Sequence, residues 1–156
     1  MSFIKKYKMQ IIYTVITLLA GGLSALLSGS FDIYSTMKQP PLAPPAIVFP
    51  IMWTILYILM GISAGIVADS HDLDRTLGLK LYFLQLALNV LWPVIFFRFK
   101  AIKFALFWLV LIIIAVIALY RESGSISKTA GRLLIPYILW LIFAFYLNFG
   151  FIILNS

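Results

Sequence analysis

Large aromatic rings and uncharged amides recur at helical spacing in this chain, and they are its best candidates for chemistry. Residues four positions apart share a face of a helix, and residues three apart lie close to that face. Three apolar segments place such residues on one face: Trp53, Tyr57, Gly61 and Gly65 in the first, Gln85, Asn89 and Trp92 in the second, and Trp140, Ala144 and Asn148 in the third. A pocket made of these side chains suits a flat, apolar, polycyclic ligand better than a sugar or an ion.

The same patterns are also typical of ordinary helix packing. Small residues let helices approach closely, and amides form hydrogen bonds between helices. Gly61 and Gly65 fit this interpretation, although they also offer a face to a second copy of the chain. For Trp53, Trp92 and Trp140, packing and an interior pocket both remain open. Trp108 near the start of its segment is typical of an aromatic belt residue at the membrane surface.

The elements that must position these residues are transmembrane helices. The sequence is 63% hydrophobic and 11% charged, which leaves too little polar surface for a water-soluble fold. A span of hydrocarbon takes roughly 20 apolar residues in a helix, and five such stretches are present: 9–27, 49–68, 81–97, 104–120 and 133–154. The sequence therefore predicts an all-α fold, one domain over 1–156 that forms an integral membrane bundle of five transmembrane helices.

The charged residues lie outside these stretches and indicate topology. Of the 12 Lys and Arg residues, eight fall on the amino-terminal side of the predicted bundle and four on the other. This bias predicts a cytoplasmic amino terminus and an external carboxyl terminus. The net charge of +7 is divided among span ends rather than gathered on one face, so no nucleic-acid partner is expected. The absence of ionisable groups within the spans argues against proton pumps, ion-coupled exchangers and voltage sensors.

Metal, thiol and nucleotide chemistry have no support in the sequence. The chain has no cysteine and one histidine, His71, in a polar turn with three aspartates that we interpret as a solvated loop. No metal site and no hydrolase, kinase or redox-cofactor motif is predicted.

One connection, 28–48, is much longer than the others and contains four of the seven prolines. Proline fixes φ and removes a hydrogen-bond donor, so the segment should be stiff and extended. Long loops in compact folds are often lids or binding loops. We therefore expect 28–48 to cover a pocket in the bundle.

Three segments closely resemble the family of tryptophan-rich sensory proteins and translocator proteins, which includes the mitochondrial peripheral benzodiazepine receptor. They are QPPLAPPAIVFPIMWTILYILMG (39–61), QLALNVLWPVIFF (85–97) and AGRLLIPYILWLIFAFYLNFGFIILN (130–155). The resemblance covers the whole chain and suggests a bacterial member in the cell membrane. It implies a five-helix bundle, usually homodimeric and embedded in membrane lipid, that binds porphyrins, haem and benzodiazepine-receptor ligands without a covalently bound cofactor.

The resemblance also implies a set of ligand-binding residues. They are Gly21, Ser24, Tyr34, Pro44, Pro45, Ile47, Phe49, Trp53, Tyr57, Asn89, Trp92, Trp140, Ala144 and Asn148. Bacterial members are associated with light-dependent breakdown of protoporphyrin IX, which requires light and oxygen and is attributed to the tryptophans that match Trp53 and Trp140. These two are therefore the candidate catalytic residues. Whether such slow turnover makes the protein an enzyme stays open, as do two other roles: a carrier of porphyrin or lipid-like ligands, and a ligand-sensing scaffold.

Overall fold

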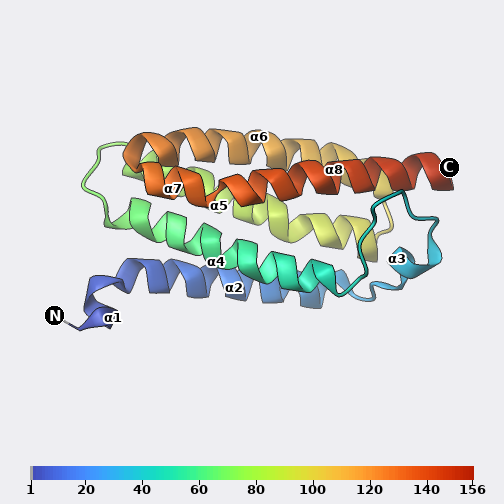
Figure 1. Cartoon of the computed structure of the whole chain (residues 1–156), viewed down its shortest axis with the longest axis horizontal. Coiled ribbons are helices and arrows are strands. Elements are labelled where there is room, and N and C mark those ends of the chain that lie inside the picture. Colours follow the sequence, from blue (N-terminus) through green and yellow to red (C-terminus); the bar gives the residue numbers. More distant parts are fainter. Residues whose placement is uncertain (1) are drawn as a thin grey trace.

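The protein is a bundle of long helices that run roughly along one axis (Figure 1). Its computed structural model describes residues 2–156, which contain helices and no strand. Five helices, counted within that range, are long and apolar enough to cross a membrane. The predicted all-α membrane bundle is confirmed. The elements are α1 (Phe3–Lys6), α2 (Lys8–Ser28), α3 (Asp32–Thr36), α4 (Val48–Asp69), α5 (Arg75–Pro93), the π-helical turn η1 (Val94–Arg98), α6 (Ile102–Ile126), α7 (Lys128–Leu133) and α8 (Ile135–Asn155).

Several helices extend beyond the apolar stretches that define them. α5 begins at Arg75 rather than at residue 81, and α6 runs to Ile126 rather than stopping at residue 120. These extensions carry charged residues such as Lys80, Arg121 and Glu122. Long side chains of this kind extend from a helix end toward water while their stems stay against apolar surface. The helices therefore outlast the hydrophobic pattern by one or two turns.

Prolines explain two interruptions in the helices. Pro93 lacks the N–H that an α-helix needs, and the backbone after it continues as the π-helical turn η1. Pro136 stands in the first turn of α8, directly after the break at Leu134 that separates α7 from α8. A proline is tolerated at that position because its missing donor would have no partner within the helix. The last transmembrane segment thus consists of two helices.

The helices α2 and α4 pack closely against each other, and two glycines make this approach possible. A Cβ atom built on Gly61 would lie 2.3 Å from Thr14 Cα, and one built on Gly65 would lie 2.3 Å from Gln10 Cα. Backbone occupies the space that any side chain would need. The two glycines therefore pack against α2 of the same chain, and the alternative that they form a face for a second copy is wrong.

Buried polar groups hold α2 against α5. Thr17 Oγ1 and the Tyr82 hydroxyl lie 2.6 Å apart, and Ser24 Oγ donates to Val90 O over 2.9 Å. Large apolar side chains cover the outside of the helices instead, among them Leu19, Leu26, Ile114, Leu139 and Ile153. An apolar exterior and a partly polar interior are what a bundle in lipid requires.

Candidate ligand-binding site

The indole rings of Trp53 and Trp140 meet between α4 and α8. Their centroids lie 6.5 Å apart with the planes at 87°, an edge-to-face contact. Phe49 approaches Trp140 in the same manner at 5.8 Å, and Tyr57 lies 5.4 Å from Trp53. Such pairs attract because the positive edge of one ring faces the negative face of the other. The four rings, Phe49, Trp53, Tyr57 and Trp140, form what we call the aromatic cluster.

One buried polar atom in the aromatic cluster has no partner. Trp140 is only 9% exposed, and its Nε1 is buried without a hydrogen bond. Buried indole N–H groups normally find an acceptor, and leaving one without costs about 1–3 kcal/mol. The unpaired donor therefore marks a place where an acceptor atom of a ligand would be stabilised.

A buried hydrogen-bond network lies beneath the aromatic cluster. The Tyr57 hydroxyl donates to Asn89 Oδ1 over 2.9 Å, and Asn89 Nδ2 donates to the Tyr137 hydroxyl over 2.6 Å. The Tyr137 hydroxyl in turn donates to Gln85 Oε1 over 2.9 Å. The chain of bonds joins α4, α5 and α8 and fixes the ring of Tyr57. Satisfied networks of this kind make a site rigid.

The segment before α4 covers this end of the bundle, as Figure 1 shows for the short helix α3 and the irregular connection that follows it. Tyr34 is buried there between Phe49 at 5.0 Å and Phe151 at 5.6 Å, and its hydroxyl donates to Pro44 O. Burial raises the pKa of the Tyr34 hydroxyl above its ordinary value. Tyr34 thus links the loop to the aromatic cluster.

The loop is also fastened to the carboxyl end of α8. Asn155 exchanges two hydrogen bonds of 2.9 Å with the backbone of Lys38, and the Tyr146 hydroxyl donates to Pro41 O over 2.6 Å. Pro40 lies so close to Gly150 that a Cβ atom there would be 2.6 Å from the proline ring. The loop is therefore held in place by its contacts with α8. It was predicted to be extended throughout, but α3 shows that its first part is helical.

Comparison with known proteins decides the family. The model of the TspO/MBR family matches residues 12–154. The chain belongs to the TspO/MBR family. It is 36% identical over 143 residues to protein CrtK of Rhodobacter capsulatus, covering 89% of this chain and 88% of that one. The tryptophan-rich protein TspO of Chlorobaculum tepidum is 36% identical over 124 residues, 78% of each chain. The translocator protein of Bos taurus is 32% identical over 142 residues, 88% of this chain and 84% of that one.

The structure of this TspO/MBR protein gives several predicted site residues a packing role. Trp92 Nε1 donates to Ala105 O over 3.1 Å and joins α5 to α6, and Ser24 joins α2 to α5 as described. The Asn148 amide, oriented so that both of its atoms are satisfied, donates to Ile102 O over 3.1 Å and accepts from Leu106 N over 3.3 Å. These polar groups were expected to face a ligand, but their hydrogen bonds are made to neighbouring helices.

The remaining predicted residues differ in their surroundings. Gly21 supports the aromatic cluster from α2, since a Cβ atom on it would lie 2.3 Å from Tyr57 Cε2. Ala144 is buried in the same core as Trp140. Pro44 contributes its carbonyl to Tyr34, whereas Pro45 is exposed and Ile47 is 65% exposed. Of these three residues in the carboxyl-terminal half of the loop, only Pro44 contributes to the covered region, through its backbone carbonyl.

Trp108 is another tryptophan whose role differs from the prediction. It was interpreted as a belt residue at the membrane surface, but its Nε1 donates to Leu88 O over 2.8 Å between α6 and α5. Sequence reasoning also missed the fastening of the loop by Tyr146 and Asn155. These contacts join residues more than 100 positions apart, and no local pattern announces them.

The aromatic cluster is packed ring against ring. We expected a dry cavity between the indoles, whereas the centroid separations are those of rings in direct contact. The structure does have a hollow of about 590 Å³, but it lies at the opposite end of the bundle, beside Met9, Arg75 and Phe83. A ligand at the aromatic cluster would have to separate the rings, and the loop above them is the element whose movement would allow it.

Proposed function

We propose that this TspO/MBR protein binds a tetrapyrrole, protoporphyrin IX or haem, at the aromatic cluster and promotes light-dependent oxidative degradation of protoporphyrin IX. The observation that carries the proposal is the buried, unpartnered Nε1 of Trp140, which lies against Trp53 and Phe49. A flat aromatic ligand between these rings would separate them and replace their contacts with one another by face and edge contacts of its own. A carboxylate or other acceptor on its rim would satisfy the indole N–H.

The residues present favour a metal-free porphyrin as the substrate for degradation. The chain has no cysteine, and its one histidine, His71, follows α4 at the far end from Trp53. Histidine and cysteine, two of the usual axial ligands of haem iron, are therefore missing from the aromatic cluster. Haem could still bind through its ring face and carboxylates, as protoporphyrin IX would.

Light and dioxygen supply the driving force and the oxidant in this proposal. The porphyrin absorbs the light, and its excited state either takes an electron from a neighbouring indole or passes its energy to dioxygen. Trp53 and Trp140 are the nearest oxidisable side chains, since both lie within the aromatic cluster. The loop that holds Tyr34 over the cluster would keep the reactive species close to its target.

A paired substitution tests the proposal. Purified protein with Trp53→Phe and Trp140→Phe is titrated with protoporphyrin IX in the dark and then illuminated at saturating porphyrin. Loss of one hydrogen bond should weaken binding by up to about tenfold, while the rate of loss of porphyrin absorbance falls to that of free porphyrin. Trp108→Phe is the matched control, because its indole bonds to the backbone of α5 outside the cluster. An unchanged rate in the double variant refutes the photochemical role of the two indoles.

A measurement in the dark separates degradation from transport. The protein is reconstituted into the membrane of sealed vesicles, and protoporphyrin IX is added on one side without illumination. Degradation alone requires no transfer, so the proposal expects porphyrin to reach the far side no faster than in protein-free vesicles. Accelerated transfer together with light-independent porphyrin levels would identify a carrier instead.

A further inference from the structure

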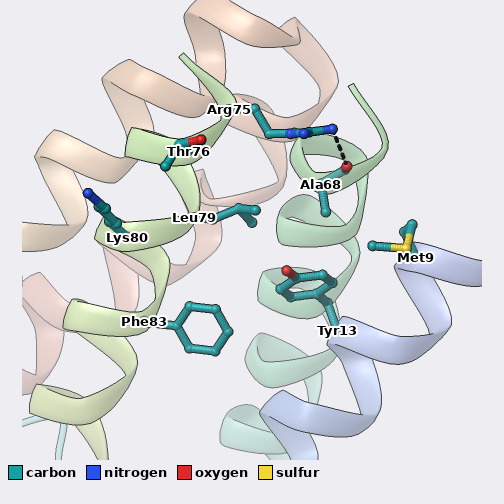
Figure 2. Close-up of a pocket in the computed structure, with 8 residues that line it drawn as sticks. All are labelled: Met9, Tyr13, Ala68, Arg75, Thr76, Leu79, Lys80 and Phe83. Atoms are coloured by element: carbon teal, nitrogen blue, oxygen red, sulfur yellow. Dashed lines mark hydrogen bonds between the residues drawn. The ribbon is translucent and has the colours of Figure 1, made fainter. Parts of the chain in front are cut away.

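A hollow distant from the aromatic cluster combines cationic and apolar walls. It is an open surface groove of about 590 Å³ between α2, the end of α4 and the start of α5, and Figure 2 shows its lining. Its eight lining residues are Met9, Tyr13, Ala68, Arg75, Thr76, Leu79, Lys80 and Phe83. Two of them are cations and none is a carboxylate. We call this hollow the basic groove.

The polar and apolar parts of the basic groove are separated along the bundle axis. Arg75 lies where α4 ends and α5 begins, while the rings of Tyr13 and Phe83 lie further along the helices toward the middle of the bundle (Figure 2). The two rings are 6.1 Å apart and come from α2 and α5. A molecule in the groove would therefore meet positive charge near the end of the helices and aromatic surface below it.

Arg75 is held in position by the end of α4. Its Nη1 donates to Ser70 O over 3.0 Å and to Ala68 O at 3.5 Å, the second contact being drawn in Figure 2. These bonds occupy one nitrogen of the guanidinium, which carries five N–H donors. The remaining donors are left for a partner. Lys80 is exposed five residues further along α5, and its ammonium group points away from Arg75 in Figure 2, so its flexible stem would have to turn to bring it to the same partner.

We propose that the basic groove binds one anionic phospholipid, with its phosphate between Arg75 and Lys80 and the start of an acyl chain against Tyr13 and Phe83. Basic pockets between transmembrane helices are suited to acidic lipid headgroups. Charge complementarity identifies the headgroup, and the aromatic wall identifies the chain. A soluble anion would use only the cations, and a zwitterionic lipid would bring its own positive group next to them. The proposal is independent of the tetrapyrrole function, since the groove and the aromatic cluster are at opposite ends of the bundle.

Native mass spectrometry of the full chain tests the proposal. The protein is placed in nanodiscs with equal amounts of phosphatidylglycerol and phosphatidylcholine and then released, and the lipids that stay bound are counted. One phosphatidylglycerol should remain per chain in preference to phosphatidylcholine. Arg75→Gln should reduce its retention about fivefold, and Arg75→Gln with Lys80→Gln about thirtyfold, in line with the usual contribution of a cation near a lipid surface.

Two further variants, a control and a test of the aromatic wall, make the result decisive. Lys100→Gln with Lys103→Gln removes the same charge from the other end of the bundle, between η1 and the first turn of α6, and should leave retention unchanged. The second variant keeps the charge and changes the aromatic wall of the groove. Phe83→Ser should lower the retention of phosphatidylglycerol severalfold, and because Phe83 is exposed, the fold should survive. Equal retention of the two lipids, an equal loss in the Lys100 and Lys103 variant, or full displacement by inorganic phosphate would each overturn the lipid assignment.

Discussion

Gly21 supports the aromatic cluster because the ring of Tyr57 lies directly on it. In Gly21→Ala the new Cβ would come within 2.3 Å of Tyr57 Cε2 and 2.6 Å of Cδ2. The ring must move, which strains its hydrogen bond to Asn89. We expect a loss of about 1–3 kcal/mol in the free energy of unfolding and weaker porphyrin binding. Unfolding in mixed detergent micelles and fluorescence titration measure the two effects.

Gly22→Ala is the matched control for this prediction. It lies one position along α2, and a Cβ atom there meets nothing within 4 Å. Both variants raise helix propensity equally, so a difference between them isolates the contact with Tyr57. If Gly21→Ala behaved like Gly22→Ala, Tyr57 would not be held where the structure places it.

For single residues, the sequence pattern predicted the rings of the site but not the partners of its polar groups. Helical spacing placed Trp53 and Tyr57 on one face because periodicity depends only on local geometry. It could not predict that Ser24 and Asn148 would bond to backbone atoms of other helices. Those bonds depend on how helices are rotated against one another, which one helix's sequence does not encode.

The close packing of α2 against α4 leaves no room for a side chain at Gly61. In Gly61→Ala the new Cβ would lie 2.3 Å from Thr14 Cα and 2.7 Å from Thr14 N. Backbone atoms cannot swing away as a side chain can, so the helices must separate. We expect a loss at the upper end of the usual 1–3 kcal/mol for overpacking, or more, and a larger loss than for Gly21→Ala. Unfolding in mixed micelles measures it.

Gly124→Ala in α6 provides the comparison for that prediction. Its Cβ would lie 3.9 Å from Gly131 Cα, an ordinary contact, so stability should change little. Equal stability of the Gly61→Ala and Gly124→Ala proteins would show that α2 and α4 are further apart than the structure has them.

The same elements show why hydropathy predicted the helices better than their ends. Apolar stretches long enough to cross lipid must be helical, because lipid offers no partner for unpaired backbone groups. Beyond the lipid, capping and local hydrogen bonds decide, and α6 continues through Arg121 and Glu122 to Ile126. The short helix α3 and the π-helical turn η1 were missed for a related reason: each is too short to leave a periodic signal.

In the molecule as a whole, our proposals assign a different binding site to each end of the bundle. One end carries the basic groove at the α4 to α5 junction, and the other carries the aromatic cluster beneath the loop. The loop is fastened to α8 by side chains that come from the last turns of the chain. Opening of the site for a ligand therefore depends on contacts between the loop before α4 and the carboxyl end of the protein.

Tyr146→Phe tests that dependence with the smallest change the chain allows. It removes the hydroxyl that donates to Pro41 O over 2.6 Å and leaves the ring in place. One such bond contributes about 0.5–1.5 kcal/mol, so the loop should open roughly two to ten times more often while global unfolding changes little. Hydrogen exchange over residues 38–44 should rise by that factor, and porphyrin should bind and leave faster.

Tyr120→Phe, at an exposed tyrosine near the far end of α6, is the control. Unchanged hydrogen exchange in the Tyr146 variant would mean that Asn155 and the contact of Pro40 with Gly150 hold the loop without the hydroxyl. If porphyrin bound and left faster while hydrogen exchange in the loop stayed the same, the ligand would enter elsewhere in the bundle.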